Sequence, residues 1–181
     1  MNKKDNLVWI DLEMTGLSLE KDVILEIASI VTDKDLNVLA HGPSLSIHHS
    51  DVVLEEMNSV VAEFHRKSGL LEEVRHSAIN LQDAEQQTLD FIREYCLPEV
   101  APLCGNSIWQ DRAFLRIYMP RLLSYLHYRL IDVTSFKEII MRWYPEDPHA
   151  FFEKRDAHRA LDDIKESIAE LNHYRKYFLV S

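Results

Sequence analysis

Residues 7–16 read LVWIDLEMTG, and this stretch is the main indication of the fold in the sequence. Residues 7–10 are rich in β-branched and aromatic side chains, the run ends at Asp11, and the loop residues Thr15 and Gly16 follow. Short apolar runs bounded by turn residues are typical of buried strands. We therefore expect a buried first strand that carries acidic side chains at its carboxyl end.

The following residues predict a hairpin and then alternating helices and strands. Residues 23–32 and 36–49 are strand candidates joined by a polar turn at 33–35. Further strand candidates cover residues 101–105 and 128–133. Apolar residues at helical spacing predict helices over residues 51–67, 81–95, 114–119, 135–143 and 160–177. This order predicts an α/β fold with a mixed sheet, part hairpin and part crossover.

Two helix starts have local signals. Asp51 is a favourable N-cap for the first predicted helix. Ser135 and Glu138 have the spacing of a capping box, with Thr134 just before them. Helices are therefore expected to begin at these two points.

The composition suits one compact domain, which we take to span residues 1–181. The chain has 181 residues, of which 46% are hydrophobic. Cys96 and Cys104 are too few for a disulfide framework, and no His is spaced to complete a zinc site with them. No apolar run reaches the roughly 20 residues of a membrane span, and the start MNKKDN lacks the apolar stretch of a signal peptide. These features predict a cytoplasmic protein with no membrane partner.

The formal net charge of −10 argues against binding to long nucleic acids. Non-specific binding to long RNA or DNA depends on Lys and Arg side chains that release counterions from phosphates. A short anionic substrate remains compatible with an acidic protein if metal ions neutralise the carboxylates.

Asp11 and Glu13 form the first candidate site. Side chains two residues apart on a strand point the same way, so both carboxylates share one face while Leu12 faces the other. Crowded carboxylates repel each other unless a cation bridges them, and hard oxygen ligands suit Mg²⁺ or Mn²⁺. In a chain with 30 acidic residues this pattern also arises by chance, so a solvated strand end is the alternative.

Two further stretches combine acidic residues with helix starts. Residues 105–111 read GNSIWQD, and the polar turn places Asp111 in the first turn of the next helix. There an Asp also complements the helix dipole, so a structural role stays open. Residues 156–163 read DAHRALDD and place His158 with two carboxylates at the start of the last helix. The alternative there is an exposed polar N-terminus.

In this order, DLEMTGL at residues 11–17, GNSxxQD at 105–111 and HxAxxD at 158–163 resemble the DEDDh exonucleases. Their forms are most similar to the oligoribonucleases, which degrade very short RNAs. The resemblance implies a ribonuclease H-like fold, with a mixed five-stranded sheet flanked by helices. It also implies 3′-to-5′ cleavage of RNA dinucleotides and slightly longer oligonucleotides to 5′-mononucleotides.

The resemblance further implies a metal-ligand set and a base. The ligands are Asp11, Glu13, Asp111 and Asp163, which would hold two Mg²⁺ or Mn²⁺ ions per active site, and His158 is the general base. Four-residue spacing alone would instead pair His158 with Asp162 on one helical face. The family pattern selects Asp163.

A second polar cluster bears on substrate length. Tyr128 and Arg129 lie on a predicted strand, and Thr134 and Ser135 open the next helix. Such a cluster would hold a terminal 5′ phosphate and limit the ligand to a few nucleotides, although ordinary N-capping is the alternative. The resemblance implies that Ser107, Arg129 and Thr134 cap this phosphate. It also implies that Tyr128 and Arg129 come from the second subunit of a homodimer.

Leu17, Met14 and Tyr128 also receive roles from the resemblance. Leu17 matches a residue that wedges between the two bases, and Met14 belongs with the substrate-binding residues. Tyr128 joins His158 among the catalytic residues. These assignments depend on the family pattern.

One position departs from the family. Val60 stands where a Trp typically packs beside a base, and base stacking on an aromatic ring is worth roughly 1 to 3 kcal/mol. Phe64 or His65 is the candidate replacement, and His65 is therefore included among the substrate-binding residues.

Three other functions compete with this interpretation. A proofreading or maturation exonuclease would want a basic channel for long RNA or DNA, which the net charge of −10 does not favour. A catalytically silent binding module would not need the full ligand set and His158. A metal phosphatase acting on small phosphate esters would not need Leu17 or Arg129.

Overall fold

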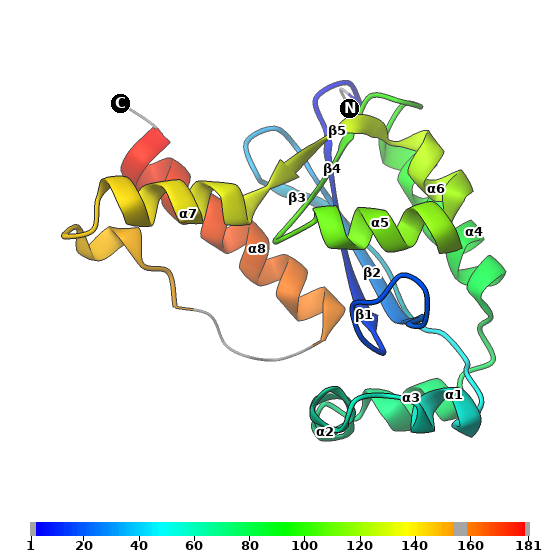
Figure 1. Ribbon diagram of the computed structural model, residues 1–181. Coiled ribbons are helices and arrows are strands. Elements are labelled where there is room, and N and C mark those ends of the chain that lie inside the picture. The colour runs from blue at the N-terminus through cyan, green and yellow to red at the C-terminus, as the bar shows by residue number, and fades with distance from the viewer. Residues whose placement is uncertain (1–2, 154–158, 180–181) are drawn as a thin grey trace.

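The structure is a computed structural model that describes residues 3–153 and 159–179. Within these residues, five strands form one mixed sheet in the order β3-β2-β1-β4-β5 (Figure 1). β1 pairs antiparallel with β2 and parallel with β4, β2 pairs antiparallel with β3, and β4 pairs parallel with β5. The strands are β1 (Leu7–Met14), β2 (Ile24–Thr32), β3 (Val38–Ser46), β4 (Pro102–Gly105) and β5 (His127–Asp132). The predicted mixed sheet of hairpin and crossover strands is confirmed.

Helices cover both faces of the sheet. The helices of the described residues are α1 (Asp51–Glu55), α2 (Ser59–Lys67), α3 (Leu70–His76), α4 (Leu81–Tyr95), α5 (Trp109–Tyr118), α6 (Pro120–Tyr125), α7 (Val133–Trp143) and α8 (Ala160–Tyr174). A 3₁₀ turn, Pro148–Ala150, follows α7, and a π-helical segment, Arg175–Leu179, follows α8. None of the helices described is long and apolar enough to cross a bilayer.

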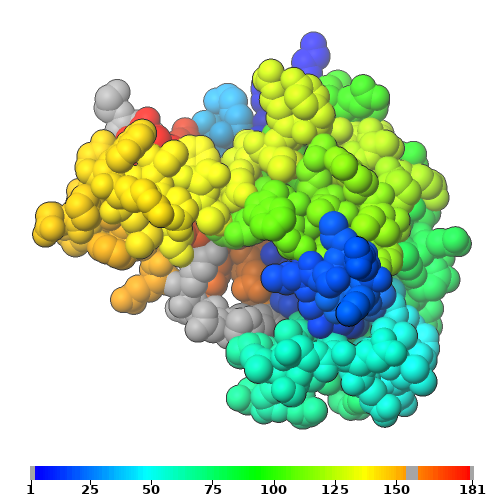
Figure 2. Space-filling view, in the orientation of Figure 1, coloured from blue at the N-terminus to red at the C-terminus, as the bar shows by residue number. Residues whose placement is uncertain are grey.

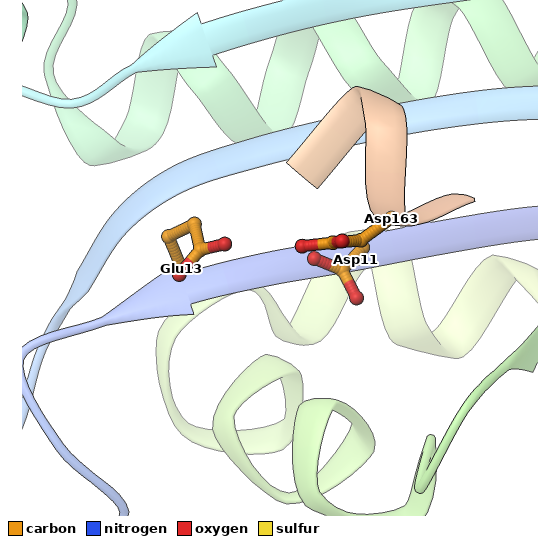
Figure 3. Close-up of side chains that lie close together, drawn as sticks. All are labelled: Asp11, Glu13 and Asp163. Carbon is orange, nitrogen blue, oxygen red and sulfur yellow. The ribbon is translucent and has the colours of Figure 1, made fainter. Parts of the chain in front are cut away.

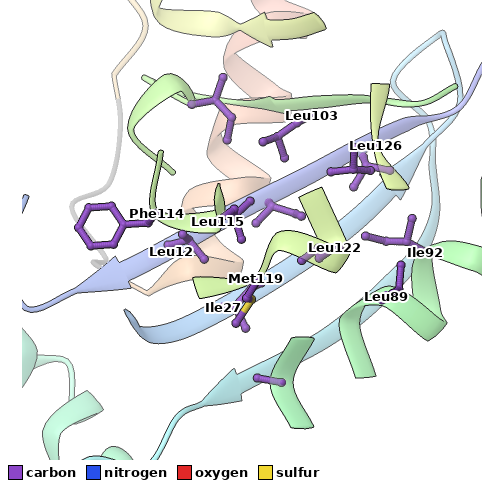
Figure 4. Packing of buried hydrophobic residues seen from close by; sticks show 14 of the residues in the cluster. Leu12, Ile27, Leu89, Ile92, Leu103, Phe114, Leu115, Met119, Leu122 and Leu126 are labelled. Carbon is purple, nitrogen blue, oxygen red and sulfur yellow. The ribbon is translucent and has the colours of Figure 1, made fainter. Parts of the chain in front are cut away.

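Alternation along β1 divides the interior into two cores. Val8, Ile10 and Leu12 pack against residues of α4, α5 and α6 (Figure 4). Trp9 points to the opposite face and packs with α7 and α8. Because side chains of a strand alternate between its faces, every odd-numbered residue of β1 faces α8. The acidic residues of β1 therefore face that helix.

Helices α1 to α3 form a small separate layer beside the ends of β1 and β2 (Figure 1). The single helix expected over residues 51–67 is wrong, because α1 ends at Glu55 and α2 begins only at Ser59. The side chain of Asn58 accepts the N–H of Val60 at 2.9 Å and so caps a second helix. The expected N-cap at Asp51 is also wrong, since Ser50 holds that position.

The capping box expected at Ser135 and Glu138 is wrong as well. α7 begins two residues earlier, and its N-cap is Asp132, whose Oδ1 accepts the N–H of Thr134 at 3.0 Å. An Asp at the end of a strand can cap the helix that follows without any box. Thr134 consequently lies inside the first turn, close to the end of β4.

Candidate active site

Asp11 and Glu13 of β1 meet Asp163 of α8 at one point. One carboxylate oxygen from each of the three side chains lies within 4.8 Å of the others. In Figure 3 the side chains of β1 and the first turn of α8 point toward one another. The odd-numbered face of β1 and the start of α8 thus bring together residues that are about 150 positions apart in the sequence.

Asp111 lies beside this cluster in the first turn of α5. It is buried, and its Oδ1 accepts the backbone N–H of Leu12 at 3.0 Å. It does not belong to the group of three described carboxylates within 4.8 Å. Its negative charge nevertheless contributes to raising the pKa of Asp11. The four carboxylates predicted from the sequence therefore lie together, with Asp111 at the edge.

Burial and mutual repulsion disfavour the charged form of these carboxylates. Burial first, and then the charges of Asp111 and Glu13, raise the pKa of Asp11 well above its ordinary value. Burial first, and then the charges of Asp163, Glu26 and Asp111, raise the pKa of Glu13 to about 8. Burial raises the pKa of Asp111 to about 7. A bound cation would reverse these effects, because its positive charge stabilises carboxylates.

The donor set fits a hard divalent cation. The three clustered groups offer carboxylate oxygens, which suit Mg²⁺ or Mn²⁺ better than the thiolate and imidazole ligands typical of structural zinc. Cys96 and Cys104 are both buried and unoxidised, and neither belongs to the cluster. The arrangement can therefore bind a divalent cation that polarises a phosphate ester.

A partly buried ion pair that the sequence did not suggest holds the start of α8. Glu26 of β2 stands opposite Glu13 and is almost fully buried. Its carboxylate accepts from Arg159 Nη2 at 3.0 Å and from the N–H of Ala160 at 3.2 Å. Arg159 Nη2 also donates to Glu73 of α3 at 2.7 Å. The one signal in the sequence is an acidic residue in a strand whose other side chains are mostly apolar.

The last helix also resolves the choice between its two neighbouring aspartates. Asp162 points to solvent, where Lys165 Nζ lies 2.8 Å from its Oδ1. Asp163 lies in the carboxylate cluster. The geometry therefore favours Asp163, as the family pattern does. His158 lies outside the described residues.

The segment after β1 borders an open cavity of about 790 Å³. Leu17 lies at its wall with 69% of its surface exposed, and Val61 of α2 lines the opposite side. Gln110 Nε2 donates to the carbonyl of Leu17 at 3.2 Å and thereby ties this loop to α5. In Figure 2 the blue residues that follow β1 lie next to the cyan and turquoise residues of α1 and α2, and the cavity is lined by residues of these segments. Leu17 is thus an exposed apolar side chain at the wall of this cavity.

His65 and Phe64 lie at different depths of α2. His65 is only 3% exposed, and its Nε2 lies 2.9 Å from the carbonyl oxygen of Met14. Its Nδ1 lies 3.8 Å from Glu13 Oε2. Phe64 is exposed. His65 thus braces the end of β1, whereas Phe64 offers a ring face to solvent.

Ser107 and Thr134 lie together at the ends of β4 and β5. The N–H of Ser107 donates to Thr134 Oγ1 at 2.9 Å, and the two hydroxyl oxygens are 3.2 Å apart. Tyr128, by contrast, is 68% exposed on β5, and its hydroxyl accepts from Arg129 Nε at 3.1 Å. The structure therefore brings together the first pair, while Tyr128 and Arg129 contact each other on an edge strand.

Comparison with known proteins agrees with this geometry. The model of the exonuclease family RNase_T matches residues 8–171. An oligoribonuclease from Ruthia magnifica subsp. Calyptogena magnifica is 53% identical over 179 residues, which is 99% of each chain. An oligoribonuclease from Pseudomonas fluorescens (strain Pf0-1) is 52% identical over 179 residues, again 99% of each chain. This chain belongs to the oligoribonuclease family.

Solved structures place the oligoribonuclease-family fold among larger exonucleases. Exonuclease I from Methylocaldum szegediense has a TM-score of 0.72 at 17% identity, over 96% of this chain and 41% of that one. E. coli exonuclease I in complex with a 5cy-dT13 oligonucleotide has a TM-score of 0.73 at 16% identity, over 97% of this chain and 42% of that one. At such identities the likeness shows the fold alone, and that fold is ribonuclease H-like, as expected. The chain spans about two fifths of those proteins and nearly the full length of the curated relatives.

Proposed function

We propose that this chain is a 3′-to-5′ exoribonuclease that degrades RNA dinucleotides and slightly longer oligonucleotides to 5′-mononucleotides. The observation that carries the proposal is the cluster of the carboxylates of Asp11, Glu13 and Asp163 in a member of the oligoribonuclease family. The whole chain forms one exonuclease domain, residues 1–181, in the cytoplasm.

Asp11, Glu13, Asp111 and Asp163 would hold two Mg²⁺ or Mn²⁺ ions. When bound, such ions neutralise the carboxylates and supply the Lewis acidity that activates water and stabilises a leaving oxygen. The raised pKa values of Asp11 and Glu13 support this assignment. They result from burial and from neighbouring negative charges that the protein itself compensates only partly.

His158 is the proposed general base. It takes a proton from a water molecule whose oxygen attacks the phosphorus of the last phosphodiester. The bond from phosphorus to the 3′ oxygen breaks, which leaves a 5′-mononucleotide and a shorter RNA with a 3′ hydroxyl. Because an ordinary imidazole titrates near pH 6.5, activity should rise through neutrality as His158 loses its proton.

Substrate length is limited, in this proposal, by a cap over the 5′ phosphate. Ser107 and Thr134 provide one side of the cap, and Arg129 and Tyr128 of the second subunit of a homodimer provide the other, Tyr128 acting with His158 in catalysis. Leu17 wedges between the two bases, next to Met14 and His65.

The homodimer is supported by the outer end of the sheet. β5 is an edge strand, and unpaired edges are normally covered or blunted. Tyr128 on this strand, Trp109 on α5 and Trp143 on α7 are all exposed. Exposed aromatic side chains next to an open strand edge are features of a surface that binds a partner.

The test uses 5′-labelled RNAs of two, three, five and at least ten nucleotides, with Mg²⁺, with Mn²⁺ or with a chelator. Asp163→Asn is the inactivating variant, and Asp162→Asn, an exposed neighbour on the same helix turn, is its matched control. We expect metal-dependent cleavage that is fastest on the shortest RNAs, is lost in Asp163→Asn and is kept in Asp162→Asn.

Other outcomes would identify the competing functions. Equal or faster cleavage of the long RNAs would indicate a general exonuclease. Binding of dinucleotides without cleavage would indicate a silent module. Preferential hydrolysis of mononucleotide esters would indicate a phosphatase.

A further inference from the structure

Asn106 joins a buried carboxylate of α8 to the Ser107–Thr134 pair. Its Nδ2 donates to Ser167 Oγ at 2.7 Å and to Glu170 Oε2 at 3.0 Å. On the other side, Asn106 Oδ1 accepts from Thr134 Oγ1 at 3.1 Å. One amide therefore spans the space between α8 and the first turn of α7.

Glu170 fixes the orientation of that amide. It is 0% exposed, and its other oxygen, Oε1, accepts from the hydroxyl of Tyr174 at 3.0 Å. Burial raises the pKa of Tyr174, which keeps that hydroxyl protonated. A carboxylate offers only acceptors, so the NH₂ group of Asn106 must face Glu170 and its carbonyl oxygen must face Thr134.

The orientation of the Asn106 amide then determines which of the two hydroxyl groups donates and which accepts. Thr134 has one hydroxyl proton, and it is committed to Asn106. The lone pairs of Thr134 Oγ1 accept the N–H of Ser107 at 2.9 Å. The backbone N–H of Thr134 is taken by Asp132. In the 3.2 Å contact between the two hydroxyl oxygens, Ser107 is therefore the donor, and its hydroxyl can turn from Thr134 to a ligand.

The backbone of Ser107 supports this division of roles. Its φ is 47°, in the left-handed region that residues other than glycine rarely adopt. Its N–H is held there by both Thr134 Oγ1 and Asp132 Oδ1, the latter at 3.0 Å. Strained conformations persist where neighbouring groups fix them, and they gather at functional sites. Ser107 is exposed, as a group that meets a ligand must be.

We propose that Glu170 sets the direction of a hydrogen-bond relay through Asn106 and Thr134, so that the hydroxyl of Ser107, and not that of Thr134, donates a hydrogen bond to the 5′ phosphate. The relay rests on the proposed function, in which Ser107 and Thr134 lie at the phosphate cap. Within that cap, the relay gives different roles to two residues that both carry a hydroxyl group. Ser107 donates to the phosphate, whereas Thr134, Asn106 and Glu170 are positioning residues.

The experiment compares RNA dinucleotides with a 5′ phosphate and with a 5′ hydroxyl. The readout is the ratio of kcat/KM for the two substrates, with kcat and KM measured separately. A hydrogen bond to a charged group is worth enough to give the wild type a ratio of roughly tenfold or more. Ser107→Ala should reduce the ratio toward one.

Glu170→Gln tests the relay. A glutamine can present either its NH₂ group or its oxygen to Asn106, so the direction of the relay is no longer enforced. We expect the ratio to fall several-fold through a higher KM for the phosphorylated dinucleotide. Glu138→Gln, the same change on the exposed surface of α7, should keep the wild-type ratio.

Ser167→Ala provides a second test if Glu170→Gln does not fold. Alanine is the best helix former, and this change removes one of the two acceptors of the Asn106 amide. It should lower the ratio less than Glu170→Gln does.

The outcomes separate the two levels of the proposal. A wild-type ratio near one would overturn the phosphate cap and the relay with it. A ratio that is lost in Ser107→Ala but retained in both Glu170→Gln and Ser167→Ala would leave the cap in place and overturn the relay.

Discussion

The carboxylate cluster and the Ser107–Thr134 network are both polar sites at the ends of strands. They differ in whether the protein itself compensates their charges and hydrogen-bonding groups. At the cluster, Asp11, Glu13 and Asp163 bring like charges within 4.8 Å. At the network, the backbone N–H groups of Ser107 and Thr134 have acceptors within 3.0 Å. A ligand of opposite charge would therefore complete the first site, whereas the second site is already organised before a ligand arrives.

The largest effect should follow from Asp11→Asn. The change removes a proposed metal ligand and one of the repelling charges without altering the shape of the side chain. We expect activity to fall by about 10³-fold or more, because stabilisation by a bound ion is worth several kcal/mol. In chelator, the same variant should unfold at a higher temperature than the wild type, because less repulsion remains.

Activity assays check the expected loss of activity, and thermal denaturation in chelator checks the expected rise in unfolding temperature. Asp162→Asn is the control and should change neither quantity appreciably. A lower unfolding temperature for Asp11→Asn in chelator would show that the repulsion is already compensated within the protein.

A second prediction concerns pH. The pKa of Glu13 is raised from 4.5 to about 8, and that of Asp111 from 3.8 to about 7. Between the ordinary and the raised pKa, the folded protein binds more protons than the unfolded chain, so stability falls as pH rises. In chelator, the free energy of unfolding should therefore decrease from about pH 4.5 to about pH 8 by several kcal/mol, because each pKa unit corresponds to about 1.4 kcal/mol.

Saturating Mg²⁺ should flatten this dependence, because the ion stabilises the charged carboxylates. Urea denaturation at several pH values, with and without the ion, measures the effect. A stability that rises across this window in chelator would contradict the raised pKa values.

The sequence predicted much of this contrast. The alternation of side chains along a strand and the position of a residue within a helix depend on neighbouring residues in the sequence. The period of two in β1 was enough to place Asp11 and Glu13 on one face, and the turn after β4 was enough to put Asp111 in the first turn of α5. The family pattern chose Asp163 where spacing alone favoured Asp162. In these cases the neighbouring residues determine the direction of the side chain.

The sequence did not predict features that depend on distant or competing partners. The break between α1 and α2 depends on Asn58 taking the N–H of Val60, which outweighs the continuous apolar spacing across it. The start of α7 depends on Asp132, which lay inside the expected strand. The pair of Glu26 and Arg159 joins residues 133 positions apart, and no spacing rule can reveal it. The role of His158 stays a prediction, because that residue lies outside the described part of the chain.

Arg159 gives a third test, of intermediate size. It is a cation beside the acidic cluster, and its fork reaches Glu26 and Glu73 at the same time. A lysine keeps the charge but cannot donate to two carboxylates in this geometry. Arg159→Lys should raise the Mn²⁺ concentration needed for half-maximal activity by about tenfold, the scale for groups that position metal ligands.

Arg142→Lys is the matched control, because Arg142 pairs with Glu138 on the exposed surface of α7. It should leave the metal dependence unchanged. An unaltered metal dependence in Arg159→Lys would mean that the charge alone, and not the fork, holds the start of α8.

The smallest effect concerns Val60, which is 60% exposed on α2 and adjoins Val61 at the cavity that Leu17 borders. This surface has neither the repulsion of the cluster nor the hydrogen bonds of the network, so it can contribute only contact area. A tryptophan here would add a ring on which a base can stack, worth at most roughly 1 to 3 kcal/mol. Because an exposed ring must also be ordered on binding, we expect Val60→Trp to lower the KM for a dinucleotide only several-fold, with kcat little changed. Val38→Trp, on exposed β3, should leave KM unaltered. An unchanged KM in Val60→Trp would place the base elsewhere, with the exposed Phe64 as the next ring to remove.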